Sequence, residues 1–381
     1  MSTNPRIYLD FNATTPLVPA AREALEAVLA AAAVLGNPSS IHAEGRRARD
    51  QVERARNQVA ARVGRAREQV VFTSGGTEGN VLGVLGLAAV VEARGGPRVI
   101  AAAAIDHPSL RGAVAALVAR GWGERALAVT DDGALVVPDL AGVGLVCASA
   151  VNHEIGTRVD LAALARAARA AGALIHIDAV QAAGKLALAA IDADALALSS
   201  HKIGGPQGAG ALVLAIDEAL PIVDGGHQER GRRAGTENVL GIVGLGAAAA
   251  AVDVASWSAV AALGDRLEAG LLAIEGARIH GAGAPRIGGT INCGFSGALG
   301  ESIVVALDLA GVSVSTGAAC TSGSIRPSPV LLAMGMPAER AREAVRFSLG
   351  RSTTAAEIDE VVARLPGIVS RARAHRSSPG Q

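Results

Sequence analysis

Along residues 70–215, short apolar runs alternate with longer segments whose apolar positions recur at helical spacing. Short runs bounded by turn residues favour buried strands, and the longer periodic segments favour helices. The predicted strands are 70–73, 99–104, 126–129, 144–148, 174–178, 195–198 and 211–215. Helices are predicted at 81–93, 108–120 and 160–171. Strands that alternate with helices indicate an α/β fold with a mostly parallel sheet flanked by helices.

Helical and strand-like patterns also flank this region. Before it we expect a strand at 7–9 and helices at 19–35 and 43–63. After it we expect a helix at 239–252, a helix at 259–275, strands at 278–280 and 287–295, a helix at 301–310, a strand at 312–314 and helices at 329–334 and 337–343. The basic segment 46–67 is interleaved with acidic residues, so we interpret it as a solvated helix face.

The composition changes at residues 254–258, where we expect a domain boundary. The large domain is expected to span 15–255. A smaller α+β domain is expected to combine 1–14 with 256–381. The chain beyond about residue 370 is basic and then rich in Ser, Gly and Pro, so we expect a disordered tail.

Composition and charge exclude several function classes. Lys+Arg and Asp+Glu are equal at 35 each, so no electrostatic argument favours nucleic acid or a membrane as a partner. The longest uncharged apolar run, 239–252, has 14 residues and is too short to span a bilayer. The N-terminus shows no signal-peptide pattern, and three cysteines without a paired pattern indicate a reducing compartment. We expect a cytoplasmic protein without a metal site, because no Cys or His stands at ligand spacing.

Two polar residues follow predicted buried strands and suggest chemistry. Lys202 comes directly after strand 195–198, beside hydroxyls and an imidazole and before a glycine-rich segment. Such a lysine can be desolvated and become nucleophilic, although an ordinary surface turn explains it equally well. Asp178 ends strand 174–178, where a helix cap or a turn residue is the simple alternative. Together the two side chains match the protein groups of pyridoxal phosphate (PLP) chemistry.

Further polar groups are expected at the same edge of the sheet. The glycines before Thr77 open a helix and can present free N–H groups to a phosphate, unless they only cap that helix. His107, Asn152 and His153 also follow predicted strands, and several polar groups at one edge favour a site over isolated turn residues.

Two residues near the C-terminal end are further candidates. Cys320 lies in a loop of small polar residues, where it is either a mobile nucleophile or an idle surface thiol. Arg346 interrupts an apolar strand-like run, so it either binds a carboxylate or faces solvent from an edge strand.

The order and spacing of four motifs resemble those of the NifS/IscS-type cysteine desulfurases, which are class V aminotransferases of PLP fold type I. These motifs are Thr73-Ser74-Gly75-Gly76-Thr77-Glu78, Asp178-Ala179-Val180-Gln181, Ser199-Ser200-His201-Lys202 and Gly317-Ala318-Ala319-Cys320-Thr321-Ser322. The resemblance covers nearly the whole chain and implies a fold type I PLP-dependent transferase.

The resemblance also implies roles for the matching residues. Lys202 would be the Schiff-base lysine, and Asp178 would pair with the pyridinium nitrogen. His107 would stack on the ring, and Gln181 would hydrogen-bond its phenolic oxygen. The phosphate would be held by Gly76, Thr77, Ser199, His201 and, from the other subunit of a homodimer, Thr236.

For the substrate side, the resemblance implies that Arg346 binds the carboxylate of L-cysteine and that Asn152 lies near the substrate. Cys320 would take the sulfur as a persulfide, release L-alanine and pass the sulfur to an acceptor protein for iron–sulfur cluster assembly or for tRNA or cofactor thiolation. His153 departs from the family pattern, because it stands where the family usually has asparagine. Its titratable ring puts the reaction rate and the pH profile in question.

Other activities fit the same residues. A selenocysteine lyase or another class V aminotransferase or lyase would use the same cofactor site. A catalytically silent scaffold in sulfur transfer is the alternative outside enzymes.

Overall fold

A seven-stranded sheet forms the centre of the computed structural model, which describes residues 6–31, 34–217, 223–317 and 326–377. Its strands are β2 (Val70–Thr73), β3 (Val99–Ala103), β4 (Gly123–Leu127), β5 (Leu145–Ser149), β6 (Leu174–Asp178), β7 (Ala195–Ser199) and β8 (Gly210–Leu214). They lie in the order β2-β8-β7-β6-β5-β3-β4, and β8 alone runs antiparallel to its neighbours. The predicted, mostly parallel sheet is therefore present.

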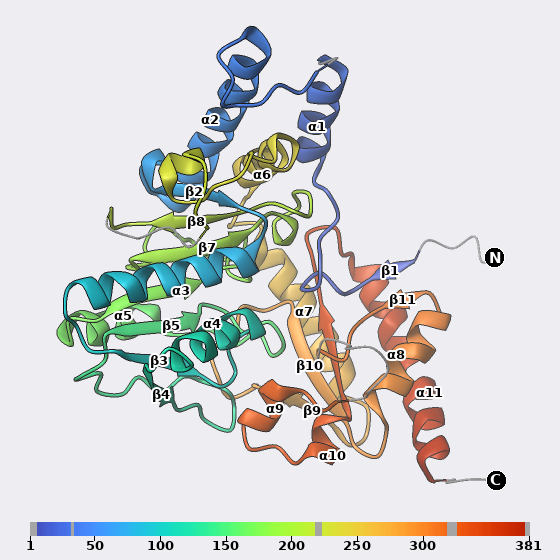
Figure 1. Ribbon diagram of the computed structural model, residues 1–381. Helices are drawn as coiled ribbons and strands as arrows, with labels where there is room; N and C mark the ends of the chain where they lie inside the picture. Colours follow the sequence, from blue (N-terminus) through green and yellow to red (C-terminus); the bar gives the residue numbers. More distant parts are fainter. Residues whose placement is uncertain (1–5, 32–33, 218–222, 318–325, 378–381) are drawn as a thin grey trace.

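Both faces of this sheet are buried except at the edge strand β4, which explains why the other strands are almost entirely apolar. Alternate positions such as Ile175 and Ile177 join one core, together with α2 (Ala43–Val63), α5 (Leu161–Ala170) and α6 (Val239–Ala251). The intervening positions join a second core beneath α3 (Gly76–Ala93) and α4 (Pro108–Val118), which lie in front of the sheet in Figure 1. Leu174, His176 and Asp178 share this second face, because side chains alternate along a strand.

Two N-terminal helices extend away from the sheet at the top of Figure 1: α1 (Pro19–Ala31) and α2, both packed on α6. The expected solvated face of α2 is correct for most of its arginines. Arg56 is the exception, because it is buried and forms a double hydrogen bond with Glu229. Among the described helices, α6 included, none combines the length and the apolar character needed to cross a membrane.

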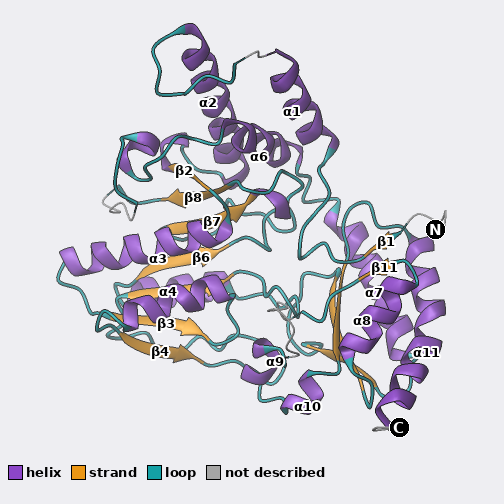
Figure 2. Cartoon of the chain, turned by 45° about the vertical axis from the view of Figure 1, so that its right-hand side comes forward, coloured by secondary structure: helices purple, strands orange, loops and turns teal. Residues whose placement is uncertain are grey.

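A smaller antiparallel sheet, β12 (Ala344–Ser348)-β10 (Thr290–Phe295)-β9 (Ala277–His280), stands beside the large one. Figure 2 shows α7 (Trp257–Leu272), α8 (Gly300–Leu309) and α11 (Ala355–Ser377) on its far side. The N-terminal strand β1 (Ile7–Tyr8) pairs with β11 (Val312–Ser313), and two short helices, α9 (Pro329–Ala333) and α10 (Ala338–Ala341), precede β12. One apolar core runs continuously between the two sheets, and the predicted domain boundaries stay a prediction.

Several expectations for individual elements need correction. The strand expected at 126–129 is β4 at Gly123–Leu127, and α3 begins at Gly76 instead of residue 81. The disordered tail is wrong as far as Ser377, because α11 continues to that residue. Apolar residues at helical spacing bury one side of α11, among them Ile358, Val361, Leu365, Val369 and Ala372. This burial outweighs the basic composition of the last turns.

Candidate active site

The carboxyl ends of parallel strands meet at one edge of the large sheet, and the candidate residues follow these ends. Gly76 and Thr77 follow β2, His107 follows β3, and Asn152 with His153 follows β5. Asp178 ends β6, and the Lys202 turn follows β7. The predicted convergence of polar groups at this edge is present.

Lys202 ends a short 3₁₀ turn after β7 and reaches the N-terminal segment. Its Nζ donates to the main-chain oxygens of Asn12 and Ala13, the latter at 2.7 Å. The turn is tied to the same segment by the amide of Thr15, which donates to His201 O at 2.9 Å. Burial and nearby Arg346 lower the pKa of Lys202 to about 8, although two carboxylates oppose the shift. A substantial fraction of this amine is therefore neutral at physiological pH.

A buried amide holds the carboxylate of Asp178. Asn80 of α3 donates through Nδ2 to Asp178 Oδ2 at 2.9 Å, and the amide of Val180 donates to Oδ1 at 2.9 Å. Burial raises the pKa of Asp178, while these hydrogen bonds and nearby His107 lower it. The carboxylate is thus placed and hydrogen-bonded in the interior of the sheet edge.

His176 fixes which way the Asn80 amide points. Asn80 Nδ2 donates to Asp178 and to Ser109 Oγ, so its Oδ1 faces His176 Nε2 at 2.9 Å. Burial lowers the pKa of His176 to about 3, so this histidine is neutral and carries its proton on Nε2. Strand alternation places His176 beneath Gly83 of α3, where an added Cβ would lie 2.4 Å from the imidazole.

His107 caps α4 and belongs to the same network. Its Nδ1 accepts from the amide of Ser109 at 3.1 Å and lies 2.8 Å from Ser109 Oγ. The proton of the neutral ring therefore lies on Nε2. Burial is the main cause that lowers the pKa of His107. His153 packs against His107 edge to face, with 5.0 Å between ring centroids.

His153 stays uncharged despite its titratable ring. Burial lowers its pKa well below the ordinary value, and the electrostatic influence of nearby His107, Arg346 and Lys202 adds to this effect. Its Nδ1 has no hydrogen-bond partner among the described residues, and its Nε2 lies 3.6 Å from Glu154 Oε1. The departure from asparagine at this position therefore adds bulk but no charge.

The start of α3 forms an open cradle close to β7. A Cβ added at Gly76 would lie 2.5 Å from Val180 Cγ2 and 3.5 Å from Ser199 Cβ, so only glycine fits there. A Cβ added at Gly75 would meet only Ser199 Oγ, at 4.0 Å. The free N–H groups of this first helical turn can therefore bind an anion. The His201 ring contacts the N-terminal segment through Nδ1, which lies 3.1 Å from Thr14 Oγ1.

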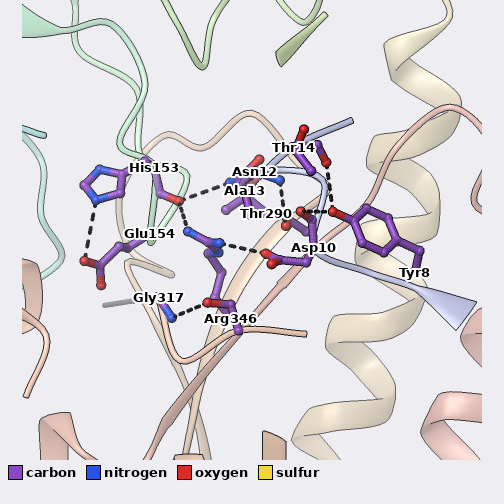
Figure 3. A network of polar contacts seen from close by, with 12 residues as sticks. Tyr8, Asp10, Asn12, Ala13, Thr14, His153, Glu154, Thr290, Gly317 and Arg346 are labelled. Carbon is purple, nitrogen blue, oxygen red and sulfur yellow. Dashed lines mark hydrogen bonds and ion pairs between the residues drawn. The ribbon is translucent and has the colours of Figure 1, made fainter. Parts of the chain in front are cut away.

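Asn12 links the N-terminal segment to the site through its main chain and its side chain. Its carbonyl oxygen accepts from Lys202 Nζ and from Gln181 Nε2, the latter at 2.9 Å. Its Nδ2 donates to the main-chain oxygen of His153 and to Thr290 Oγ1, as Figure 3 shows. Its Oδ1 accepts from Lys185 Nζ at 2.9 Å.

Arg346 of β12 enters the site from the small sheet. Its Nη2 forms an ion pair with Asp10 Oδ1 at 2.7 Å, and Nη1 donates to His153 O at 3.1 Å (Figure 3). Its buried Nε has no partner in the described part of the chain. The alternative of a solvent-facing arginine is thus wrong: β12 is an edge strand of the small sheet, but Arg346 is buried beside Asp10.

The segment that leads to Cys320 begins at this point. The amide of Gly317 donates to Ser315 Oγ, and an added Cβ at Gly317 would lie 3.0 Å from Glu154 Oε2. Gly317 has φ of 87°, which glycine adopts without strain. Cys320 itself lies outside the described residues.

Comparison with known proteins agrees with this geometry. A family model described as "Aminotransferase class-V" matches residues 7–361. A cysteine desulfurase of Enterobacter agglomerans is 41% identical over 379 residues, covering 96% of this chain and 93% of that protein. A cysteine desulfurase of Cereibacter sphaeroides is 42% identical over 384 residues, covering 97% of each chain. The solved structure of a NifS-like protein superimposes with a TM-score of 0.86 at 29% identity, covering 96% of this chain and 100% of that one.

The chain belongs to the aminotransferase class-V family. The predicted family resemblance and the predicted fold class are both confirmed. Class-V aminotransferases are PLP-dependent enzymes, and the residues at this sheet edge fit that cofactor. The site offers an amine of lowered pKa in Lys202, a buried carboxylate in Asp178 and a glycine cradle that an added Cβ would fill.

The individual site assignments differ in what supports them. Lys202, Asp178, His107, His153 and Gln181 are brought together by the contacts described above. Asn152 is buried and closes a turn: its Nδ2 donates to Ile105 O, and its Oδ1 accepts from the amide of Glu154. Thr236 is exposed on the loop before α6, and no contact among the described residues joins it to the others.

Sequence reasoning missed Asn12, Asn80, His176 and Lys185 as members of this class-V site. Alternation along β6 offered one signal, because it places His176 on the same face as Asp178. No local pattern indicated Asn80, because its role depends on how α3 lies over the sheet.

Proposed function

We propose that this class-V aminotransferase is a PLP-dependent cysteine desulfurase that removes sulfur from L-cysteine, releases L-alanine and carries the sulfur as a persulfide on Cys320. The observation that carries the proposal is that Lys202, an amine of lowered pKa, and the buried Asp178 lie at the ends of two adjacent strands, β7 and β6. The two relatives named cysteine desulfurase, which match nearly the full chain, support the substrate.

Lys202 would attach the cofactor and then act as the base at the substrate Cα. PLP would supply an electron-accepting ring when bound. A lysine amine with a pKa of about 8 is neutral often enough near pH 7–8 to take a proton and return it. Its partners in this structure are main-chain oxygens, which it can leave without stranding a buried charge.

Asp178 and its neighbours would hold the ring. The carboxylate, oriented by Asn80, would face the pyridinium nitrogen, and the His107 ring would cover one face. Gln181 would donate to the phenolic oxygen. The first turn of α3 at Gly76 and Thr77, with Ser199 and His201, would hold the phosphate.

Arg346 would bind the substrate carboxylate, with Asn152 nearby. Support comes from its burial and from its Nε, which lacks a partner among the described residues. Asp10 already occupies Nη2, so the substrate would meet an arginine held in one orientation. Preorganisation of this kind lowers the cost of binding.

Cys320 would take the sulfur. Its thiolate would attack the sulfur of the substrate, so that an S–S bond forms as the C–S bond breaks and the carbon fragment leaves as alanine. The other cysteines cannot substitute easily, because burial raises the pKa of Cys147 well above its usual value and that of Cys293 to about 12. The sulfur acceptor, the homodimer with its Thr236 contact, and the cytoplasmic location stay predictions.

The test compares Cys320→Ser with Cys293→Ala in assays of alanine and sulfide release from L-cysteine. We expect Cys320→Ser to bind PLP with an unchanged visible spectrum but to release no sulfide, and Cys293→Ala to keep its activity. Sulfide release by Cys320→Ser at the wild-type rate would overturn the role of Cys320. A preference for selenocysteine would favour a selenocysteine lyase, and amino-group transfer to a keto acid would favour an aminotransferase. A protein that binds a partner but does not turn over cysteine would favour the silent scaffold.

A further inference from the structure

Lysine is nearly absent from this chain. Of its 35 lysine and arginine residues only two are lysines, Lys185 and Lys202. Every other basic side chain of these two types is arginine, on the surface and in ion pairs alike. The two lysines hydrogen-bond to the same residue, because Lys202 Nζ binds the main-chain oxygen of Asn12 and Lys185 Nζ binds its Oδ1. The proposed function uses Lys202 and leaves Lys185 without a role.

Lys185 is buried and has hydrogen-bond acceptors but no counter-charge. Its Nζ lies 2.9 Å from Asn12 Oδ1 and 2.9 Å from Gln181 Oε1, and 5.3 Å from the centre of the Trp257 ring. Among the described residues no carboxylate forms an ion pair with it. The charged groups that face it are Lys202, Arg346 and Arg351, and all three are cationic. Burial and these charges lower the pKa of Lys185 to about 7.

The contacts with Asn12 and Lys185 together set the orientation of the Gln181 carboxamide. The carbonyl oxygen of Asn12 can only accept, so Nε2 must face it, and Oε1 then faces Lys185, which donates to it. Nε2 therefore donates one of its two N–H groups to the carbonyl oxygen of Asn12. Its second N–H bond is left for another acceptor. Without Lys185, Oε1 would lose its donor, and only the contact with Asn12 would hold the amide in this orientation.

We propose that Lys185 is a positioning residue that works as a neutral amine, donating its two N–H bonds to Asn12 Oδ1 and Gln181 Oε1 and thereby turning Gln181 Nε2 toward the cofactor. This inference rests on the proposed function, in which Gln181 donates to the phenolic oxygen of PLP. It gives the second lysine a task that arginine cannot perform. Arginine keeps its charge in proteins and would bring a permanent cation among three others.

The main test is a double-mutant cycle on the PLP-loaded protein, read as the pH midpoint at which the visible absorption of the bound cofactor changes. Lys185→Met keeps the chain length but removes both donors. We expect Lys185→Met to raise the midpoint by about one pH unit, because the deprotonated phenolic oxygen loses one hydrogen bond. Gln181→Met should cause a similar rise, and adding Lys185→Met to it should cause no further change.

Two results would overturn the proposal: no shift in Lys185→Met, or an equal further shift when Gln181 is already methionine. The second result would mean that Lys185 acts by its charge and not through Gln181. Arg351→Met is the matched control, because it removes a cation that faces Lys185 without touching Gln181. Any shift that Arg351→Met causes in the pH midpoint should be the same when Gln181 is methionine.

A second measurement does not depend on any variant or on cofactor binding. In wild-type protein labelled with ¹³C at the lysine ε-carbon, NMR should show two lysine signals, one of which titrates near pH 7. One signal that titrates near pH 8, as expected for Lys202, with the other above pH 9 would contradict a neutral Lys185 even if Lys185→Met fails to fold. Wild-type protein that never binds PLP would instead refute the proposed function and leave the NMR result interpretable.

Discussion

The two lysines of this chain show how different surroundings divide one chemical group between two roles. Lys202 is only half-buried, two carboxylates favour its charged form, and its amine contacts two main-chain oxygens on one turn. Lys185 is buried, and the charged groups that face it are all cations. It donates to two side chains, Asn12 and Gln181. The first amine can change partners at little cost. The second holds other groups in place.

Asn12 lies between the two lysines and is hydrogen-bonded to both. Its carbonyl oxygen, its amide oxygen and its amide nitrogen all have partners, which come from the segments after β5, β6 and β7 and from β10. A buried polar group that is completely hydrogen-bonded is rigid and costly to disturb. The N-terminal segment is therefore part of the site and not merely an edge of the fold.

The largest expected effect separates the two lysines by activity. Lys202→Ala should lose covalent cofactor attachment and reduce kcat/KM for alanine release by about 10⁴-fold or more, because both nucleophile and base are removed. Lys185→Met should keep covalent attachment and a visible spectrum. If both variants lost attachment equally, the division of roles between the lysines would be wrong.

The next largest effect is expected when Lys185 is given the carboxylate neighbour that it lacks. Asn12→Asp puts a carboxylate 2.9 Å from Lys185 Nζ, and we expect the pKa of Lys185 to rise by about two units. Lysine-selective NMR measures this shift. Thr290→Val is the control, because it removes one hydrogen-bond partner of Asn12 without adding charge. An unchanged Lys185 titration in Asn12→Asp would contradict the hydrogen bond on which the comparison depends.

A smaller effect is expected in the pH dependence of stability. The folded pKa of Lys185, about 7, lies below its ordinary value of 10.5, so the unfolded chain binds more protons between these pH values. The free energy of unfolding should therefore rise with pH in this window, by up to ~1.4 kcal/mol per pH unit from this group. Urea unfolding of the cofactor-free protein at pH 7.5 and 9.5 should show a smaller rise for Lys185→Met. An equal rise in both proteins would show that Lys185 is not the group responsible.

The smallest expected effect concerns His153, whose pKa is lowered in part by nearby Lys202. His153 is neutral because burial and neighbouring cations lower its pKa, so His153→Asn should leave the shape of the pH–rate profile unchanged between about pH 6.5 and 9. Steady-state rates across that range measure it, and we expect a change of only a few-fold in kcat. Loss of an ionisation near neutral pH in His153→Asn would mean that the imidazole titrates after all.

Much of the large sheet and the polar residues at its edge could be predicted from the sequence. Short apolar runs that end in Asp178 or lead directly to Lys202 carry their own signal, because the position at a strand end is a local property. The family resemblance added the expected roles of His107 and Gln181. The α11 helix was missed because its apolar stripe is interrupted by basic residues and by Pro366.

The supporting residues could not be predicted in the same way. Asn80 and His176 meet because α3 crosses β6 closely at Gly83, and Asn12 meets Lys185 because the N-terminal turn returns to the large sheet. Such contacts depend on tertiary packing and leave no periodic pattern. The scarcity of lysine in the sequence would have been a signal for Lys185, but it was not used.

The most direct test of the account traps the cofactor on its lysine. The PLP-loaded protein is reduced with borohydride and digested, and the lysine peptides are identified by mass spectrometry, which is unambiguous in a chain with two lysines. The account predicts the reduced cofactor on Lys202 and none on Lys185. Cofactor on Lys185, or on neither lysine, would contradict it.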